Sequence, residues 1–223
     1  MSNEGLASLL PVHGFVLAGG KSSRMGVDKA TLKFCGWPMV EIAVEKLRGF
    51  CAEVGIAGNR EDLARFAPVV GESRVDAGPA AGIEAGLKAA RQEWVLFVPV
   101  DVPLMPGELL RRWAEQVLEM DGIAASHLYY GRDQPAFCML QRDCADRFSA
   151  ALDKGERRLA VLLHEATEGF HWVHDLDELH GEDYPAIEAS RWWFMNVNTP
   201  QELAEAEAWA DCGDARKADL LRG

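Results

Sequence analysis

The chain has 223 residues, 48% of them hydrophobic, and a formal net charge of −12 at pH 7. This size and composition predict a single α/β domain over 1–223, with a core from about 12 to 210 and flexible termini at 1–11 and 211–223. The acidic charge argues against binding nucleic acid, because surfaces that bind phosphate backbones gather Lys and Arg. The apolar stretch 94–100 is far too short to cross a membrane.

The cysteines and the first residues bear on the cellular compartment. There are five cysteines, at Cys35, Cys51, Cys138, Cys144 and Cys212, with no C-x-x-C pair among them. The first ten residues lack the basic start and long apolar core of a signal peptide. Together these features predict a reduced, cytoplasmic protein.

Strand-like and helix-like segments alternate along the first part of the chain. Short apolar or β-rich runs occupy 15–18, 54–57, 95–100 and 123–130. Between them, apolar residues recur at helical spacing in 40–50, 80–92 and 106–120. This alternation predicts βαβ units around a mostly parallel sheet.

The second part of the chain continues with both kinds of element. We expect strands at 135–140 and 170–173, and helices at 144–152 and 157–166. Thr199, Pro200 and Glu202 form an N-cap, first-turn and N3 pattern, which predicts that a helix starts there. The acidic segment 174–184 is expected to be a surface loop or excursion.

The most informative stretch is GFVLAGGKSSRMGVDKATL, which follows the first predicted strand. Open parallel sheets bind ligands beyond the carboxyl ends of their strands. Gly19 and Gly20 would let backbone N–H groups approach phosphate oxygens, and Lys21, Arg24 and Lys29 would supply charged donors. A tight turn with solvated charges is the alternative. Neither the Walker A pattern nor the Rossmann glycine pattern fits this loop.

The segment LAGGKSSRMGVDK resembles the signature loop of nucleotidyltransferases with an α/β nucleotide-binding fold, most closely that of the molybdenum cofactor guanylyltransferase family. Five further motifs match this family in the expected order: AGNR (57–60), GPAAGI (78–83), PVDVPLMP (99–106), GERR (155–158) and NVNTPQEL (196–203). The resemblance spans about residues 14–208. It implies a Rossmann-like three-layer α/β/α fold of the nucleotide-diphospho-sugar transferase type.

The resemblance also implies a reaction. GMP would pass from GTP to the terminal phosphate of molybdenum-molybdopterin, with Mg²⁺ as cofactor and pyrophosphate as the second product. The implied partners are these two substrates and, as receivers of the product, molybdoenzyme apoproteins or their chaperones. Two alternatives stay open: a cytidylyltransferase that uses CTP, and a non-catalytic carrier that binds GTP. Related cytidylyltransferases tend to read LAAG where this chain has LAGG, so Gly19 favours guanine.

The implied site has a metal-binding residue, catalytic residues and nucleotide-binding residues. Asp101 follows the most apolar strand, so its carboxylate should emerge at the carboxyl edge of the sheet, where it could hold Mg²⁺ or merely cap a turn. The resemblance assigns catalysis to Arg24, Lys29 and Asp101. It assigns nucleotide binding to Leu17, Ala18, Gly19, Gly20, Lys29, Asn59, Asp76, Gly82 and Asp101.

The acidic nucleotide contact and the residues that face the second substrate complete this assignment. An acidic nucleotide contact precedes the Gly-Pro pair in the family; we expect Asp76 here, with Glu72 as the other candidate. Asn196 and Asn198 would face the pterin substrate or the metal, since alternate residues of an extended segment share a face. By composition, Arg157 and Arg158 of GERR are solvated charges of a helix; the resemblance implies instead that they help to hold the pterin phosphate.

The chemistry expected at this site is charge neutralisation and alignment. A phosphate monoester is already largely ionised near neutral pH, because its second pKa is about 6. The acceptor therefore needs no general base to attack the α-phosphorus. What the reaction requires is that two anions be aligned and that the charge on the departing pyrophosphate be neutralised.

Overall fold

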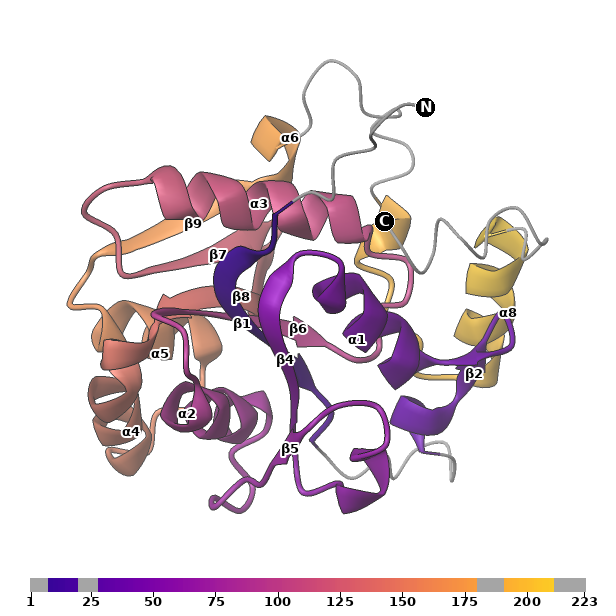
Figure 1. The fold of residues 1–223 in the computed structure, drawn as a ribbon, viewed down its shortest axis with the longest axis horizontal. Coiled ribbons are helices and arrows are strands. Elements are labelled where there is room, and N and C mark those ends of the chain that lie inside the picture. Colours follow the sequence, from indigo (N-terminus) through magenta and orange to yellow (C-terminus); the bar gives the residue numbers. More distant parts are fainter. Residues whose placement is uncertain (1–7, 20–27, 180–190, 211–223) are drawn as a thin grey trace.

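A seven-stranded sheet forms the centre of the molecule in the computed structural model, which describes residues 8–19, 28–179 and 191–210 (Figure 1). Its strands, in spatial order, are β5 (Val69–Val70), β4 (Cys51–Ala57), β1 (Leu10–Leu17), β6 (Trp94–Pro99), β8 (Asp133–Gln141), β7 (Ala125–Tyr129) and β9 (His171–Asp175). Within this sheet only β8 runs antiparallel to its neighbours. The prediction of a mostly parallel sheet is confirmed.

Helices cover both faces of this sheet. One face packs against α1 (Met39–Arg48), α3 (Gly107–Glu119) and α6 (Leu176–Leu179), and the other against α2 (Pro79–Ala89), α4 (Ala145–Asp153) and α5 (Leu159–Ala166). Short 3₁₀ helices lie at η1 (Lys29–Thr31), η2 (Glu61–Leu63) and η3 (Arg142–Cys144). The predicted three-layer α/β/α architecture is therefore confirmed. Among the described helices, none has both the length and the apolar character needed to span a membrane.

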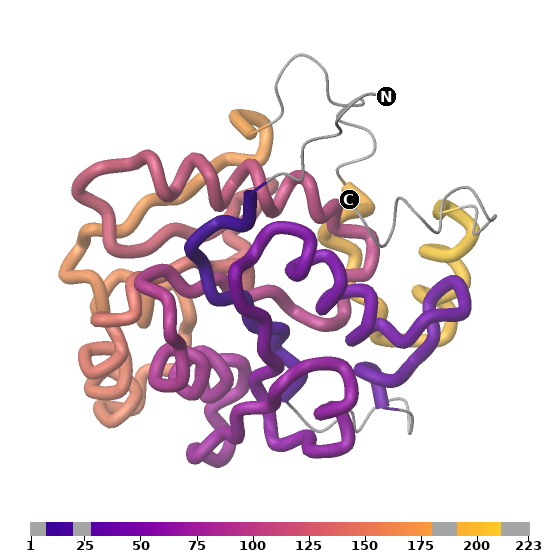
Figure 2. Tube along the Cα trace, viewed as in Figure 1, coloured from indigo at the N-terminus to yellow at the C-terminus, as the bar shows by residue number. Residues whose placement is uncertain are grey.

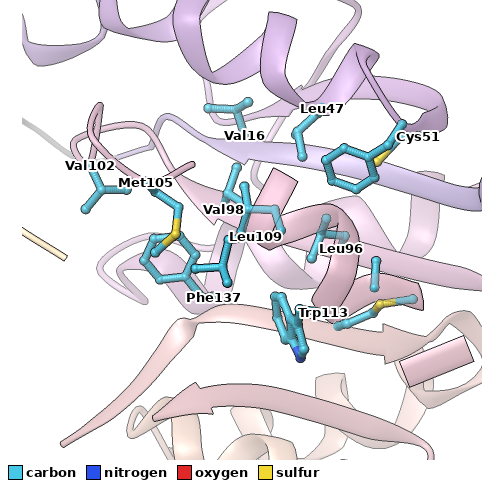
Figure 3. Close-up of a cluster of buried hydrophobic side chains, with 14 of the residues drawn as sticks. Val16, Leu47, Cys51, Leu96, Val98, Val102, Met105, Leu109, Trp113 and Phe137 are labelled. Carbon is cyan, nitrogen blue, oxygen red and sulfur yellow. The ribbon is translucent and has the colours of Figure 1, made fainter. Parts of the chain in front are cut away.

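The core explains why β1 and β6 read as continuous apolar runs. Successive strand residues point to opposite faces, and in this sheet both faces are covered. Val16 and Val98 pack with Trp113 of α3 in one buried cluster (Figure 3). Phe15 and Phe97 stack in the other cluster, with ring centroids 5.8 Å apart.

A third apolar cluster joins segments that are far apart in the sequence. The hairpin of β2 (Lys33–Phe34) and β3 (Trp37–Pro38) lies beside α8 (Pro200–Ala210), as the tube in Figure 2 shows. Phe34 and Ala206 are both fully buried in this cluster. The same cluster includes Val197, before α8, and Met39, at the start of α1. The hairpin was not among the predicted elements.

The start of α8 is confirmed. Glu202 donates its backbone N–H to Oγ1 of Thr199 at 3.1 Å, and its carboxylate accepts the N–H of Asn198 at 2.7 Å. The first bond satisfies one of the donors that a helix start leaves unpaired, and the second pairs the N–H of the residue before the N-cap. They also fix the backbone of the segment that carries the two predicted pterin-side asparagines.

Three expectations need correction. The segment 174–184 is not simply a loop, because β9 extends to Asp175 and α6 follows, with Leu176 and Leu179 buried under the sheet. Its remainder lies outside the described residues, as do 1–7 and 211–223. β1 begins at Leu10, inside the stretch expected to be a flexible terminus. Cys35 is disulfide-bonded, so the expectation of a fully reduced chain is wrong for that residue.

Candidate functional site

The site lies where the chain reverses its direction of travel across the sheet. From β1 the chain moves outward to β4 and β5 and then returns to β6 on the other side of β1. Crevices open at the carboxyl ends of parallel strands at such points. A cleft of about 310 Å³ occupies this position, lined by Leu17, Gly19, Glu72, Gly78, Pro79, Pro99, Asp101, Gln134, Ala136, Phe137 and Asn196.

Three of the predicted site residues meet beside this cleft. Nζ of Lys29, from η1, lies 3.5 Å from Oδ2 of Asp101, which follows β6. The same Nζ donates to Oδ1 of Asn198, although 169 positions separate the two residues. Both charged side chains stay about one quarter exposed. A cation and an anion are thus held at the mouth of the cleft, accessible to a ligand.

Backbone contacts hold the two sides of this meeting point together. Val197 donates its N–H to the carbonyl oxygen of Asp101 at 2.8 Å. Asn196, one residue earlier, lines the cleft. The segment Asn196–Asn198 is therefore attached directly to the loop after β6, so both predicted asparagines lie at the site.

Arg60 anchors the residue next to Lys29. Its guanidinium donates to both oxygens of Asp28, one of them at 2.7 Å, and Asp28 also accepts a bond from Oγ1 of Thr31 at 2.9 Å. Burial alone would raise the pKa of Asp28, but the bonds from Arg60 and Thr31 outweigh it and lower the pKa. Asp28 is therefore charged near neutral pH and ties η1 to the end of β4. The sequence analysis did not single out Arg60.

Glu72 lines the cleft and has one buried carboxylate oxygen. Its Oε1 is buried and has no hydrogen-bond partner among the residues that the structure describes, and burial raises the pKa of the carboxyl group. Gly19 lies directly against this oxygen: a Cβ added at Gly19 would be 2.0 Å from it. An unsatisfied buried acceptor is costly, and a ligand in the cleft that brings N–H donors to this carboxylate would offset that cost.

Asn59 holds the backbone of Glu72. Its Oδ1 accepts the N–H of Glu72 at 2.9 Å, and its Nδ2 donates to the Glu72 carbonyl oxygen at 3.1 Å. Both ends of the Asn59 amide are therefore occupied by protein backbone. The arrangement makes Asn59 a support for Glu72 in this structure, where the sequence analysis expected a residue that contacts the nucleotide directly.

The structure favours Glu72 over Asp76 as the acidic residue of the site. Asp76 is exposed, does not line the cleft and has a positive φ of 57°. Of the two acidic candidates, Glu72 lines the cleft and Asp76 does not. Gly82 of α2 remains close to the site, because a Cβ there would lie 3.3 Å from Oε1 of Glu72.

The other predicted residues divide into three groups. Leu17 lines the cleft, and Ala18 is buried beside it. Gly20 and Arg24 lie outside the described residues. The arginines of GERR do not line the cleft: Arg157 donates to the carbonyl oxygen of Leu152 at 2.9 Å, and Arg158 pairs with Glu156 at 2.7 Å.

Cleft residues on β8 were missed by the sequence analysis. Gln134 and Phe137 lie on the strand that runs antiparallel between β6 and β7, and both line the cleft together with Glu72. The expected strand began one residue after Gln134. A polar residue directly before an apolar run gives no signal that distinguishes a cleft residue from a turn residue.

A buried lysine anchors the loop that bears Asp101. Lys46 of α1 is 5% exposed and donates to the carbonyl oxygens of Pro103 and Met105 at 2.5 and 2.7 Å. Burial lowers the pKa of Lys46 from its ordinary value of 10.5 to about 7. A neutral amine still donates two hydrogens, so both bonds persist after the proton is lost.

The residues at the site fit Mg²⁺ only in combination with a substrate. No group of three or more His, Cys, Asp or Glu among residues 8–19, 28–179 and 191–210 could hold a metal ion. Asp101 does offer a partly exposed carboxylate beside the cleft. Because Mg²⁺ usually keeps several waters and takes one or two carboxylates together with substrate phosphates, this donor set suits such an ion.

Comparison with known proteins identifies the family. The model of the MobA-like NTP transferase domain matches residues 14–168. A molybdenum cofactor guanylyltransferase from Vibrio atlanticus is 33% identical over 194 residues, which cover 85% of this chain and 92% of that protein. One from Polynucleobacter asymbioticus is 32% identical over 207 residues, covering 88% and 96%. The chain therefore belongs to the MobA-like NTP transferase domain family.

Solved structures share the fold. The molybdopterin-guanine dinucleotide biosynthesis protein A from Archaeoglobus fulgidus superposes with a TM-score of 0.73 at 22% identity, over 89% of this chain and 98% of that one. A 2-C-methyl-D-erythritol 4-phosphate cytidylyltransferase from Thermus thermophilus gives 0.60 at 19% identity, over 88% and 98%. The predicted nucleotidyltransferase fold is confirmed.

The Lys46 geometry predicts a pH-dependent stability. The unfolded chain keeps the ordinary lysine pKa, so between about pH 7 and pH 10 it binds a proton that the folded protein has released. The free energy of unfolding contributed by Lys46 therefore rises with pH across this window, by at most about 1.4 kcal/mol per pH unit. Urea unfolding at several pH values should show this rise in the wild type and lose it in Lys46→Met.

Lys33→Met, at an exposed lysine of β2, is the matched control and should keep the wild-type slope. Parallel stability curves for the wild type and Lys46→Met would show that Lys46 titrates as an exposed lysine does.

Proposed function

We propose that this protein transfers GMP from GTP to the terminal phosphate of molybdenum-molybdopterin and releases pyrophosphate. The relatives named molybdenum cofactor guanylyltransferase support this proposal, since the alignments cover most of both chains. The cleft at the carboxyl edge supports it as well, because it places a lysine, a carboxylate and the Asn196–Asn198 segment around one space.

The observation that favours guanine is the unpartnered carboxylate of Glu72. A carboxylate with a free buried oxygen is matched by two neighbouring N–H donors. Guanine has such a pair, its ring N–H and its 2-amino group, whereas cytosine has one amino group beside an acceptor nitrogen. Glu72 would therefore bind guanine and select against cytosine.

Gly19 contributes to the same selection. An alanine at this position would bring its Cβ to within 2.0 Å of Oε1 of Glu72 in the present arrangement. Glycine thus leaves the space in which the carboxylate lies. This gives a physical reason why the sequence LAGG, with Gly19, belongs with an acidic residue at position 72.

The phosphates would lie beside Lys29 and Asp101. The backbone at Gly19 borders the cleft, and Lys29 would neutralise the triphosphate while Asp101 faces it. An Mg²⁺ ion held by Asp101 and the phosphates would supply further neutralisation of the leaving group. The Asp28–Arg60 contact would keep Lys29 in place during turnover.

The acceptor would enter between β8 and the segment Asn196–Asn198. Gln134 and Asn196 line this side with amide groups, and Phe137 adds an apolar surface. An oxygen of the acceptor phosphate forms a bond to the α-phosphorus, and the bond from that phosphorus to the bridging oxygen of pyrophosphate breaks. The acceptor is already an anion near neutral pH, so the residues act by alignment and no general base is needed.

The proposal extends to the cellular setting. The protein would act in the cytoplasm on GTP and molybdenum-molybdopterin, without nucleic acid or membrane. It would hand its product to molybdoenzyme apoproteins or their chaperones.

Pyrophosphate release tests the reaction directly. Purified protein with Mg²⁺ is offered GTP or CTP, with and without molybdenum-loaded molybdopterin. We expect release only when GTP and the pterin are present together, because the two anions must be aligned in one cleft. Release with CTP would assign the protein to the cytidylyltransferases, and tight GTP binding without release would make it a carrier.

The charged pair beside the cleft predicts a loss of turnover on substitution. Lys29→Ala or Asp101→Ala should lower the rate by about 100-fold or more, because each removes an electrostatic contact to the phosphates or their metal. Circular dichroism should show an unchanged fold, since both side chains are partly exposed.

Lys33→Ala and Asp121→Ala, at exposed positions of like charge, serve as controls and should keep wild-type rates. Near-normal turnover in Lys29→Ala or Asp101→Ala would remove the basis of the proposed site.

The Glu72 assignment predicts a change in nucleotide affinity. Glu72→Gln keeps the size of the side chain but replaces one acceptor oxygen by an N–H₂ group that opposes the donors of guanine. The Kd for GTP should rise by about tenfold or more, as expected for losing a hydrogen bond to a charged group. Isothermal titration of the wild type, Glu72→Gln and Asp76→Asn should show the effect only at position 72, and an effect confined to Asp76→Asn would reverse the assignment.

A further inference from the structure

The loop between β5 and α2 carries Glu72 and is held at two points. The first is the Asn59 amide, which binds the backbone of Glu72. The second is the side chain of Arg74, two residues further on. Only Ser73 separates the two anchored positions, so the conformation at Glu72 depends on both.

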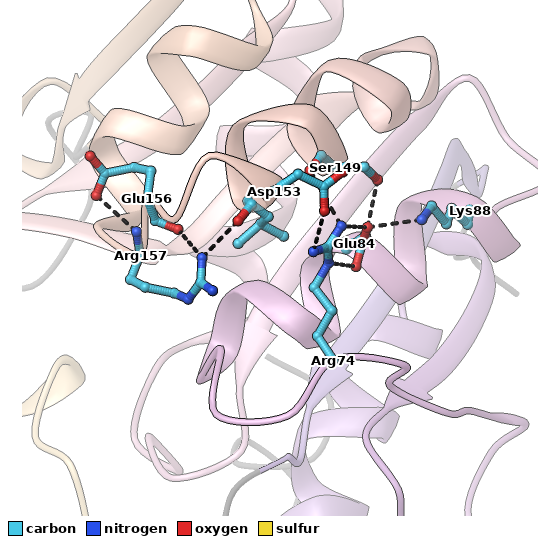
Figure 4. Close-up of polar contacts among 8 residues, drawn as sticks. Arg74, Glu84, Lys88, Ser149, Asp153, Glu156 and Arg157 are labelled. Atoms are coloured by element: carbon cyan, nitrogen blue, oxygen red, sulfur yellow. Dashed lines mark hydrogen bonds and ion pairs between the residues drawn. The ribbon is translucent and has the colours of Figure 1, made fainter.

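Arg74 forms a salt bridge with a carboxylate on the neighbouring helix, α2. Its Nε donates to Oε2 of Glu84 at 2.6 Å, and its Nη2 donates to Oε1 at 2.9 Å. This is the bidentate geometry in which a guanidinium binds a carboxylate most strongly. Arg74 also reaches α4, donating to Asp153 at 2.7 Å and to the carbonyl oxygen of Ser149 at 3.3 Å (Figure 4).

Glu84 is a buried, fully ionised anchor. Its side chain is 2% exposed and also accepts bonds from Lys88 at 2.8 Å and from Oγ of Ser149 at 2.6 Å. Burial would raise the pKa of Glu84, but the bonds from Arg74, Lys88 and Ser149 lower it to about 2. The carboxylate therefore stays charged at every pH at which the enzyme would work.

Glu72 needs such an anchor because its own position is unfavourable. A buried carboxylate oxygen without a partner gains free energy by turning toward water. The Asn59 amide fixes the backbone at Glu72, but a loop free to move two residues later could still rotate the side chain out of the cleft. The Arg74–Glu84 contact prevents this rotation because it attaches the loop to α2.

We propose that Arg74 is a positioning residue that holds the Glu72 carboxylate in the cleft and thereby sets the preference for guanine nucleotides. This inference rests on the proposed function, since it takes Glu72 as the guanine contact. Arg74 does not line the cleft. It acts through the loop that it fastens.

A purely structural role would give a different result. If Arg74 only joined the loop to α2 and α4, its loss would lower the melting temperature and weaken all nucleotides equally. A positioning role changes the ratio between nucleotides that differ only in the group facing Glu72. GTP and inosine triphosphate form such a pair, because hypoxanthine keeps the ring N–H of guanine and lacks its 2-amino group.

The test is the ratio of the Kd values for inosine triphosphate and GTP, measured by titration without the pterin acceptor. We expect the wild type to prefer GTP by about tenfold, the effect of one hydrogen bond to a charged group. Arg74→Met should bring the ratio close to one. Arg74→Lys, which reaches only one oxygen of Glu84, should give an intermediate ratio, and Glu84→Gln should behave like Arg74→Met.

Lys88→Met is the matched control. Lys88 binds the same carboxylate, but from within α2 and without touching the loop, so this variant should keep the wild-type ratio. If Arg74→Met does not fold, Arg74→Lys and Glu84→Gln still decide the question. Melting temperatures of all the variants, taken without nucleotide, show how much stability each one loses.

Two results would overturn the inference, and they are distinguishable. A wild-type ratio retained in Arg74→Met, Arg74→Lys and Glu84→Gln would show that the contact does not position Glu72, and would leave the proposed function intact. A ratio near one in the wild type would remove Glu72 as the guanine contact, and with it the guanine selection that the proposed function assumes.

Discussion

Parallel pairing of β1 with β4 on one side and with β6 on the other is the constraint on which the site depends. Because these three strands run in the same direction, their carboxyl ends lie at one edge of the sheet. Residues from three separate parts of the chain follow those ends: Gly19 after β1, Asn59 after β4 and Asp101 after β6. Helices cover both faces of the sheet, and the cleft lies at this edge.

Charges at the edge are arranged in two different ways. Asp28, Lys29 and Asp101 have partners within the protein, so each is held in place before any ligand arrives. Glu72 has a buried oxygen without a partner in the described part of the chain, a local cost that a well-packed protein otherwise avoids. A carboxylate that is costly to bury in the free protein and is hydrogen-bonded by its ligand gives selectivity for that ligand. The contacts of Asn59 and Arg74 hold the Glu72 carboxylate in the position that this requires.

Sequence reasoning located most of the fold and much of the site. Apolar runs and helical periodicity marked the buried strands and the main helices, and the order of six motifs marked the edge. The hairpin 33–38 was missed because strands of two residues carry no periodic signal. Glu72 was ranked below Asp76 because spacing alone does not show which of two nearby acidic residues turns inward. Arg60, Arg74 and Lys46 were missed because their roles depend on partners 32, 10 and 57 positions away.

The structure of the protein bound to GTP and Mg²⁺ tests the central claim most directly. The account predicts that the ring N–H and 2-amino group of guanine lie within hydrogen-bond distance of the Glu72 carboxylate. It also predicts that the α-phosphate lies beside Lys29 and Asp101. A guanine base bound out of reach of Glu72, or a triphosphate bound away from Asp101, would contradict it.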